Sequence, residues 1–289
     1  MRFSIATAYM PPEELAPIAA AADDAGYHAM SLSDHVVNLE TLATPYPYTD
    51  DGSRRWAPFT TWLDPWVTIG SLAAITERLR FFTNVYVLPM RDPFTVAKVI
   101  ATASALSGGR VALGAGMGWC EEEFNLIGQP FAKRGARADE MLELLAELWT
   151  GEWVEHHGRF YDVPRVEMTP APPAPVPIYI GGTSDAAIRR AARHDGWVSD
   201  LMSTREAGEV RTRIDAERER LGRGERDFAM IVSMNDAVTA DDYRRAAEVG
   251  VTDNLTMPWV FYGGFDLPLQ AKLDGVRRFA EEIMARVPD

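Results

Sequence analysis

The sequence has few of the residues that metal clusters, disulfides and nucleic-acid surfaces require. Cys120 is the only cysteine in 289 residues, which excludes an internal disulfide and a cysteine-based metal cluster. The net charge is -13, and only three of the 29 basic residues are lysines. A chain this acidic does not offer the concentrated basic face that nucleic acid or an anionic membrane surface requires. We therefore expect small molecules or other proteins as partners, and neither nucleic acid nor membrane.

Long apolar runs are also missing. None approaches the roughly 20 residues of a membrane span, and the start MRFSIATAYMPPEEL lacks the basic, apolar and small-residue regions of a signal peptide. We therefore expect a cytoplasmic protein.

The sequence does contain a regular alternation of short apolar runs and helical patterns. Hydrophobic residues make up 47% of the chain, which is enough for one large core. Eight strand-then-helix units can be counted, and most of the strands are continuous apolar runs, as expected where both faces are covered. This predicts an α/β fold, a (β/α)8 TIM barrel, in one domain over residues 1–289. A doubly wound sheet is the competing interpretation, which eight units disfavour.

Two long segments interrupt the alternation, one after strand 2 and one before strand 5. Residues 35–63 are rich in Pro, Tyr, Thr and Asp, and we expect them at the catalytic end of the barrel. Residues 151–177 contain a hairpin pattern turned at His157 and Gly158, followed by a proline-rich surface spacer. The substrate pocket is expected to depend on residues 46–62 and on the hairpin near His156.

A glycine-rich motif, GAGMGW, follows the fourth strand and places glycines at Gly114, Gly116 and Gly118. The third glycine of a dinucleotide fingerprint falls on Trp119 instead, so that motif fails. Two interpretations stay open. The motif is a tight turn, or it is a strand end where a flat ligand lies against the backbone because no Cβ intrudes.

A second strand end, IYIGGTSD, places Gly181, Gly182 and Thr183 before a helix capped by Ser184 or Asp185. Amides at such a helix start, together with the positive end of its dipole, can hold a phosphate if Asp185 turns away. Ordinary capping is the alternative interpretation.

Polar and aromatic side chains gather at the other strand ends. Asp34 and His35 follow strand 2, at the rim where barrel catalytic residues collect. A metal site is not expected there because no His-x-His pair accompanies them. Asn84 interrupts apolar strand 3, so it satisfies a bulge or faces a ligand. The loops also contain several aromatic residues, which either pack as a lid or line the binding site of a planar ring. They are Tyr46, Tyr48, Trp56, Trp62, Trp66 and Trp119.

These segments, in order, resemble the bacterial luciferase-like monooxygenase family. The resemblance rests on SLSDH, on the stretch that begins LDPWVTIGSLAAITERLRFFTNVYVLPMRDPF and continues through GGRVALGAGMGWCEEEF to MLELLAELW, and on PIYIGGTSDAAIRRAARHDGWV. It covers most of residues 3–197. The segments YPYTDDGSRRW and LPMRDP are most similar to the branch of oxidoreductases that depend on the deazaflavin coenzyme F420.

The resemblance implies a barrel that stacks a flavin or deazaflavin ring at the strand C-termini. It implies a non-prolyl cis peptide between Asn84 and Val85 that backs the ring, with Asp34 and His35 approaching it as catalytic residues. Some relatives carry a glutamate proton donor where this chain has Trp119, so His35 is the leading acid or base, with Glu121 and Glu122 as alternatives. The other cofactor-binding residues implied are Gly116, Met117, Gly118 and Trp119 along the ring, and Gly181, Gly182 and Thr183 at its phosphate. A homodimer or higher homo-oligomer is also implied.

The function that follows is hydride transfer between C5 of F420 and a small organic substrate, with His35 exchanging the proton. An imidazole suits this role because it titrates near neutral pH. Three alternatives remain: an FMN-dependent monooxygenase on the same scaffold, a flavin-binding protein without turnover, and a metal-dependent barrel hydrolase.

Overall fold

Eight parallel strands close into a barrel in the computed structural model, which describes residues 1–287. β1 pairs with both β2 and β11, and β3 pairs with β5, so the described sheet has no open edge. The predicted (β/α)8 barrel is therefore confirmed. Its strands are β1 (Arg2–Ala6), β2 (Ala29–Leu32), β3 (Arg80–Thr83) with its continuation β4 (Tyr86–Val87), β5 (Val111–Gly116), β8 (Ile178–Gly181), β9 (Gly196–Met202), β10 (Ala229–Met234) and β11 (Asp253–Thr256).

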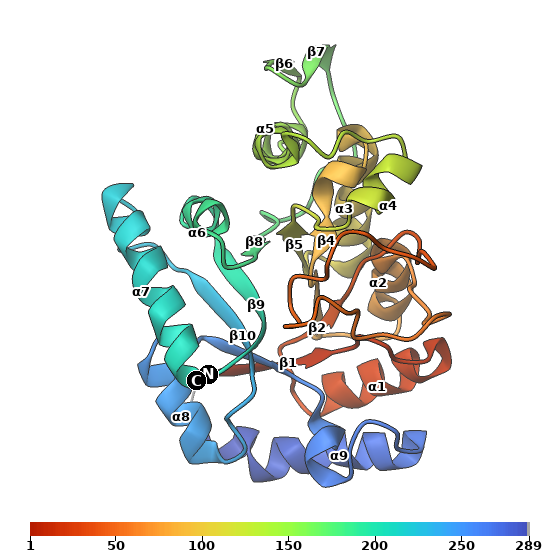
Figure 1. Cartoon of the computed structure of the whole chain (residues 1–289), viewed down its shortest axis with the longest axis vertical. Coiled ribbons are helices and arrows are strands. Elements are labelled where there is room, and N and C mark those ends of the chain that lie inside the picture. Colours follow the sequence, from red (N-terminus) through yellow and green to blue (C-terminus); the bar gives the residue numbers. More distant parts are fainter. Residues whose placement is uncertain (288–289) are drawn as a thin grey trace.

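Helices surround the strands, as Figure 1 shows. None of the helices in residues 1–287 is long and apolar enough to cross a membrane. The helices are α1 (Pro12–Asp24), α2 (Pro65–Ala73), α3 (Pro93–Ser107), α4 (Glu121–Leu126), α5 (Arg134–Leu148), α6 (Asp185–Ala191), α7 (Thr204–Arg220), α8 (Ala240–Glu248) and α9 (Leu269–Glu282), with 3-10 turns η1 (Leu88–Met90), η2 (Pro258–Tyr262) and η3 (Met284–Arg286).

Local sequence explains where these helices begin and end. The Asp64 carboxylate accepts hydrogen bonds from the first amides of α2, and Pro65 occupies the first helical position, where its missing N–H costs nothing. Asp92 and Pro93 start α3 in the same way, and Gly108, at φ 67°, ends it in the left-handed conformation. The loops at the strand C-termini thus lead into fixed helix starts.

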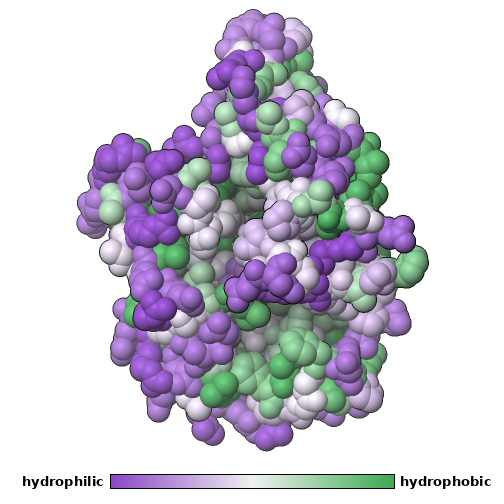
Figure 2. All heavy atoms as spheres, in the orientation of Figure 1, coloured by the Kyte–Doolittle hydropathy of each residue, from purple (hydrophilic) through white to green (hydrophobic). Residues whose placement is uncertain are grey.

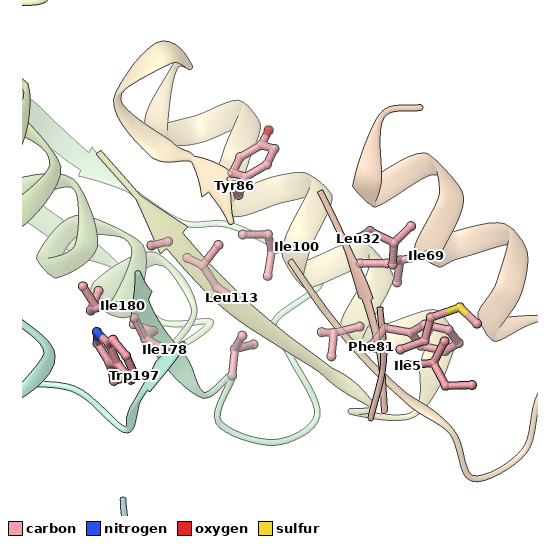
Figure 3. Packing of buried hydrophobic residues seen from close by; sticks show 14 of the residues in the cluster. Ile5, Leu32, Ile69, Phe81, Tyr86, Ile100, Leu113, Ile178, Ile180 and Trp197 are labelled. Atoms are coloured by element: carbon pink, nitrogen blue, oxygen red, sulfur yellow. The ribbon is translucent and has the colours of Figure 1, made fainter. Parts of the chain in front are cut away.

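The apolar core forms two layers. The inner layer fills the barrel, and its members are Ala29, Phe82, Ala112, Val198, Ile231 and Leu255. The outer layer lies between strands and helices. In Figure 3, Leu32 and Leu113 of this layer come from strands, and Ile69 and Ile100 come from α2 and α3. Burial on both strand faces explains the continuous apolar runs of the sequence.

Both predicted insertions are present. Residues 33–64, here called the mouth loop, run between β2 and α2 with no helix or strand of their own. The second insertion contains the hairpin of β6 (Val154–His157) and β7 (Asp162–Val166).

The hairpin does not reach the barrel mouth. Nδ1 of His156 lies 3.0 Å from Oε2 of Glu147, within hydrogen-bond distance. Glu140 accepts hydrogen bonds from the amides of residues 159–161, and both glutamates belong to α5. Figure 1 shows the hairpin beyond α5, apart from the mouth loop. The expectation that the hairpin near His156 shapes the substrate pocket is therefore wrong, because two acidic side chains hold the hairpin to the outer helix layer.

Candidate active site

The mouth loop lies over the C-terminal ends of the strands, in front of them in Figure 1. Figure 2, drawn from the same side, shows a surface hollowed near its centre. Aromatic rings from the mouth loop meet rings from the β1–α1 and β5–α4 connections, with centroids 5.2–6.4 Å apart. We call these residues the aromatic cluster: Tyr9, His35, Tyr46, Tyr48, Trp56, Trp62 and Trp119.

His35 lies within this cluster. Its ring centroid is 4.8 Å from that of Trp62 and 4.9 Å from that of Trp56. Its Nδ1 is 3.2 Å from Oε2 of Glu123, and 14% of its side chain is exposed. Nε2 has no hydrogen-bond partner among residues 1–287. The imidazole is thus oriented through one nitrogen and keeps the other available at the barrel mouth.

Glu123, which contacts His35, was not among the site residues predicted from the sequence. Its buried carboxylate also accepts hydrogen bonds from the amides of Val36 at 2.6 Å and Val37 at 3.2 Å. Burial alone would raise the pKa of Glu123, but the hydrogen bonds from His35 and these two amides lower it. The carboxylate is therefore ionised, and it orders both the imidazole and the start of the mouth loop.

The two glutamates considered as alternative acids lie elsewhere. Glu122 accepts hydrogen bonds from the amides of Ala43 at 2.7 Å and Thr44 at 2.9 Å, which lower its pKa to about 2. A carboxyl with so low a pKa is a poor proton donor near neutral pH. Glu121 is exposed on the first turn of α4. Neighbouring Cys120 is buried, and burial raises the pKa of its thiol to about 11, which makes it a weak nucleophile.

An ion pair ties the mouth loop to the opposite side of the barrel. Nη1 of Arg55 lies 2.9 and 2.7 Å from the two carboxylate oxygens of Asp200. Asp200 belongs to β9, four strands from β2 in either direction around the barrel. Nη2 of Arg55 donates to the carbonyl of Tyr48 within the loop. The mouth loop therefore spans the barrel opening, fixed by Glu122 and Glu123 on one side and by Asp200 on the other.

Asp34 occupies a different environment from its neighbour His35. Its buried carboxylate forms a two-bond ion pair with Arg91 at 2.6 and 2.7 Å, and it accepts a hydrogen bond from the Val87 amide at 2.8 Å. These contacts join the end of β2 to the end of β4. The geometry gives Asp34 a positioning role, and its part in catalysis stays a prediction.

The bulge of the third barrel strand has the geometry that the resemblance implies. The peptide bond between Asn84 and Val85 is cis, and both residues are half-buried. Val85 fills the space that the neighbouring glycines leave. A Cβ on Gly116 would lie 2.3 Å from Cγ2 of Val85, and one on Gly181 would lie 2.7 Å from Cγ1. A flat ligand lying against Gly116 and Gly181 would therefore contact the side chain of Val85. The sequence suggested contact with bare glycine backbone instead.

The remaining GAGMGW residues also lie at the mouth. Gly118 has a φ of 78°, and a Cβ there would come 2.5 Å from the Phe124 ring, so two constraints demand glycine. The Gly118 carbonyl accepts a hydrogen bond from Arg134 at 2.9 Å. Met117 is partly buried against the core, and Trp119 is half-buried within the aromatic cluster.

The loop at Gly181, Gly182 and Thr183 leads into α6, where the Ser184 hydroxyl accepts a hydrogen bond from the Ala187 amide. Asp185 turns toward Arg213 of α7, at 2.7 Å, as the phosphate interpretation required. Arg213 also donates to the Thr183 carbonyl at 3.3 Å. Arg213, which was not among the predicted site residues, therefore lies beside the loop as the partner of Asp185.

One buried donor in the aromatic cluster lacks a partner. The indole N–H of Trp62 is inaccessible to solvent and forms no hydrogen bond with any of residues 1–287. No three His, Cys, Asp or Glu side chains lie close enough together to hold a metal ion within the described chain.

Comparisons with known proteins agree with the fold. A model of the luciferase-like monooxygenase family matches residues 2–281. An uncharacterised protein of Mycobacterium tuberculosis is 40% identical over 290 residues, which cover 99% of this chain and all of the relative.

An F420-dependent glucose-6-phosphate dehydrogenase of Nakamurella multipartita is 35% identical over 192 residues, 65% of this chain and 52% of that protein. The aligned part spans about half of that relative's length. Among solved structures, the coenzyme F420-dependent tetrahydromethanopterin reductase of Methanopyrus kandleri superposes with a TM-score of 0.78 over 99% of both chains. At 14% identity it shows the fold alone.

Proposed function

We propose that this chain, which belongs to the luciferase-like monooxygenase family, transfers a hydride between coenzyme F420 and a small organic substrate. The family and its F420-dependent members make the chain an oxidoreductase. The observation that carries the proposal is the position of His35, held by Glu123 and presenting a free Nε2 among aromatic rings at the barrel mouth.

The residues at the mouth fit a planar ring with an anionic side chain. The half-buried pair Asn84 and Val85 offers a backing surface, and Trp119 offers an aromatic edge. These residues, with Gly116, Met117 and Gly118, would hold the ring. Gly181, Gly182 and Thr183, next to Arg213, would hold the phosphate. When bound, the deazaflavin supplies the carbon that accepts or donates the hydride.

His35 would exchange the substrate proton at Nε2. An ionised carboxylate only accepts hydrogen bonds, so Glu123 keeps the hydrogen of the neutral imidazole on Nδ1. Nε2 is then the basic nitrogen, directed away from Glu123. Asp34, paired with Arg91, fixes the end of the strand that carries His35. Catalysis thus uses one proton-transferring residue and two carboxylates that position it.

The proposed cofactor rests on a named relative. The dehydrogenase that is 35% identical is named F420-dependent, and its aligned region covers 65% of this chain. This supports F420 over FMN. The proposal also includes a homodimer or higher homo-oligomer, which the family resemblance implies and sedimentation would measure.

The test is a pair of assays on the wild type and on His35→Asn. The wild type should change the F420 absorbance in the presence of substrate and should not consume oxygen with reduced FMN. His35→Asn should lose about 100-fold or more of kcat and keep its F420 affinity, since general acid–base catalysis contributes 10²–10⁴-fold. Unchanged turnover in the variant would refute the role of His35. Oxygen consumption with reduced FMN would instead identify a monooxygenase, and F420 binding without any turnover would indicate a binding protein.

A further inference from the structure

A cavity of about 1150 Å³ lies at the end of the barrel opposite the mouth loop. Its lining includes the starts of β1 and β3, at Arg2 and Arg80, the α1–β2 connection at residues 25–28, and the segment after α9. The barrel strands are parallel and run from this end to the mouth. The inner core layer, which includes Phe82 and Leu255, fills the barrel between the two ends. A ligand in this cavity would therefore be separated from the candidate active site.

The strand pattern brings charged side chains to this end of the barrel. Residues two apart on a strand share a face. Arg80 stands two positions before Phe82, and Asp253 two positions before Leu255, and both of these apolar residues fill the barrel. Arg80 and Asp253 therefore begin the inward faces of β3 and β11. Arg2, on the neighbouring strand β1, has its Nε 3.4 Å from Oδ2 of Asp253.

Two of the three arginines that line the cavity have a carboxylate nearby. Arg2 pairs with Asp253, as described above. Nη2 of Arg78 donates to the backbone carbonyl of Asp23 at 2.9 Å. Burial would raise the pKa of Asp23, but hydrogen bonds from the amides of residues 77–79 and the charge of Arg78 lower it. Asp23 is therefore ionised and offsets the charge of Arg78.

The third arginine, Arg80, has no such compensation. Its Nη2 donates to the carbonyl of Gly109 at 3.4 Å, a long hydrogen bond, and no carboxylate of residues 1–287 forms an ion pair with it. Burial and the charge of Arg80 lower the pKa of neighbouring Arg110, so two guanidiniums lie near each other here. In a chain with a net charge of -13, this end of the barrel carries a local excess of positive charge.

Much of the remaining lining is apolar. It includes Phe3, Val251, Met284 and Val287. An alkyl or aryl group placed against these side chains would leave water, which is favourable in proportion to the area buried. The chemistry of the cavity thus combines one uncompensated guanidinium with an apolar wall.

We infer that this cavity binds a small organic carboxylate with an apolar alkyl or aryl body, and that the carboxylate pairs with Arg80. A guanidinium fork matches the two oxygens of a carboxylate. A doubly charged phosphate fits less well, because its second charge would lie near the carboxylates of Asp23 and Asp253. The inference goes beyond the proposed function and does not depend on it, since the ligand is bound here and not converted.

Calorimetric titration of the whole protein near neutral pH tests this site without F420 or turnover. The probes are octanoate, octan-1-ol, which has the same body without the charge, and acetate, which has the charge without the body. Arg80→Met removes the guanidinium and keeps an apolar stem. Arg165→Met is the matched control, because Arg165 is exposed on the hairpin beyond α5, beside the ring of Trp153.

We expect octanoate to bind the wild type, and octan-1-ol and acetate to bind about tenfold more weakly or less. Arg80→Met should weaken octanoate about tenfold or more, since a charge-assisted hydrogen bond is lost, and leave octan-1-ol unchanged. Arg165→Met should match the wild type. Ala247→Glu places a carboxylate at an exposed position of the lining and leaves Arg80 in place. It should also weaken octanoate, and it decides the question if Arg80→Met does not fold.

Three results would overturn the inference. They are no binding of octanoate to the wild type, binding of octan-1-ol as tight as that of octanoate, and wild-type affinity for octanoate in a folded Arg80→Met or in Ala247→Glu. Failure of the proposed function would have a different signature, because F420 binding and turnover play no part in these titrations.

Discussion

Replacing Gly116 by Ala should disrupt the wall at the barrel mouth through a single neighbour, Val85. The added Cβ would lie 2.3 Å from Cγ2 of Val85, more than 1 Å inside ordinary contact distance. Val85 has little room to retreat, because its Cγ1 already fills the space beside Gly181. Overpacking of this kind costs about 1–3 kcal/mol. Gly116→Ala should therefore lower the free energy of unfolding by about that amount.

A second substitution checks the cause. Val85→Ala alone removes two half-buried methyl groups. Each fully buried carbon contributes roughly 0.8 kcal/mol to the free energy of unfolding. Because Val85 is partly exposed, we expect a loss of about 1 kcal/mol for the two together. Gly116→Ala combined with Val85→Ala should be less destabilised than the sum of the single variants, by about 1–2 kcal/mol, because the clash is gone.

Urea denaturation followed by tryptophan fluorescence measures these free energies. Gly70→Ala is the control, since no atom lies within 4 Å of a Cβ built there. Additive single-variant costs, or a Gly116→Ala variant as stable as the wild type, would show that Val85 does not fill the glycine space.

The remaining predictions concern charged groups. Glu123→Gln should lower kcat about tenfold or more with little change in F420 affinity, because His35 loses the anion that orients it. Steady-state kinetics and a cofactor titration measure these two quantities. An unchanged kcat would disprove the positioning role of Glu123. Arg55→Gln should change the free energy of unfolding by at most about 1 kcal/mol, since the ion pair with Asp200 is one-third exposed. The substitution should nevertheless speed proteolysis within the mouth loop. Cleavage at the wild-type rate would show that the ion pair does not hold the loop in place. Burial raises the pKa of Asp253 to about 6, so the native state holds a proton that the unfolded chain releases from about pH 4 upward, and stability should fall as pH rises from 4 to 6. Asp253→Asn should abolish that fall in calorimetric scans, and a fall of equal size in the variant would contradict the assignment.

The fold could be predicted because its signal is local and repeated. Each strand is an apolar run buried on both faces, and each helix follows with a polar cap such as Asp64 or Asp92. His35 could be placed at the mouth because the residues after a barrel strand point to the catalytic end. Both features follow from neighbouring residues alone, whichever distant segments touch.

The rest of the site depends on contacts between distant segments. Glu121, Glu122 and Glu123 look equivalent in the sequence. In the structure Glu121 is exposed, whereas Glu123, half a helical turn further on, is buried. Its partner His35 lies 88 positions earlier in the chain, so the sequence does not show the contact. The tie between Arg55 and Asp200 joins residues 145 positions apart, and the mouth loop has no periodicity that would orient it. The prediction that the hairpin near His156 shapes the substrate pocket was wrong for the same reason. Nothing in the sequence near His156 shows that Glu140 and Glu147 of α5 hold the hairpin against that helix.

The most direct test of the account is a titration of the cofactor-free protein with coenzyme F420 and, separately, with FMN, followed by tryptophan fluorescence. Quenching is expected because Trp119 belongs to the wall that would hold the ring. The account predicts micromolar or tighter binding of F420 and clearly weaker binding of FMN. Preference for FMN, or binding of neither, would contradict it.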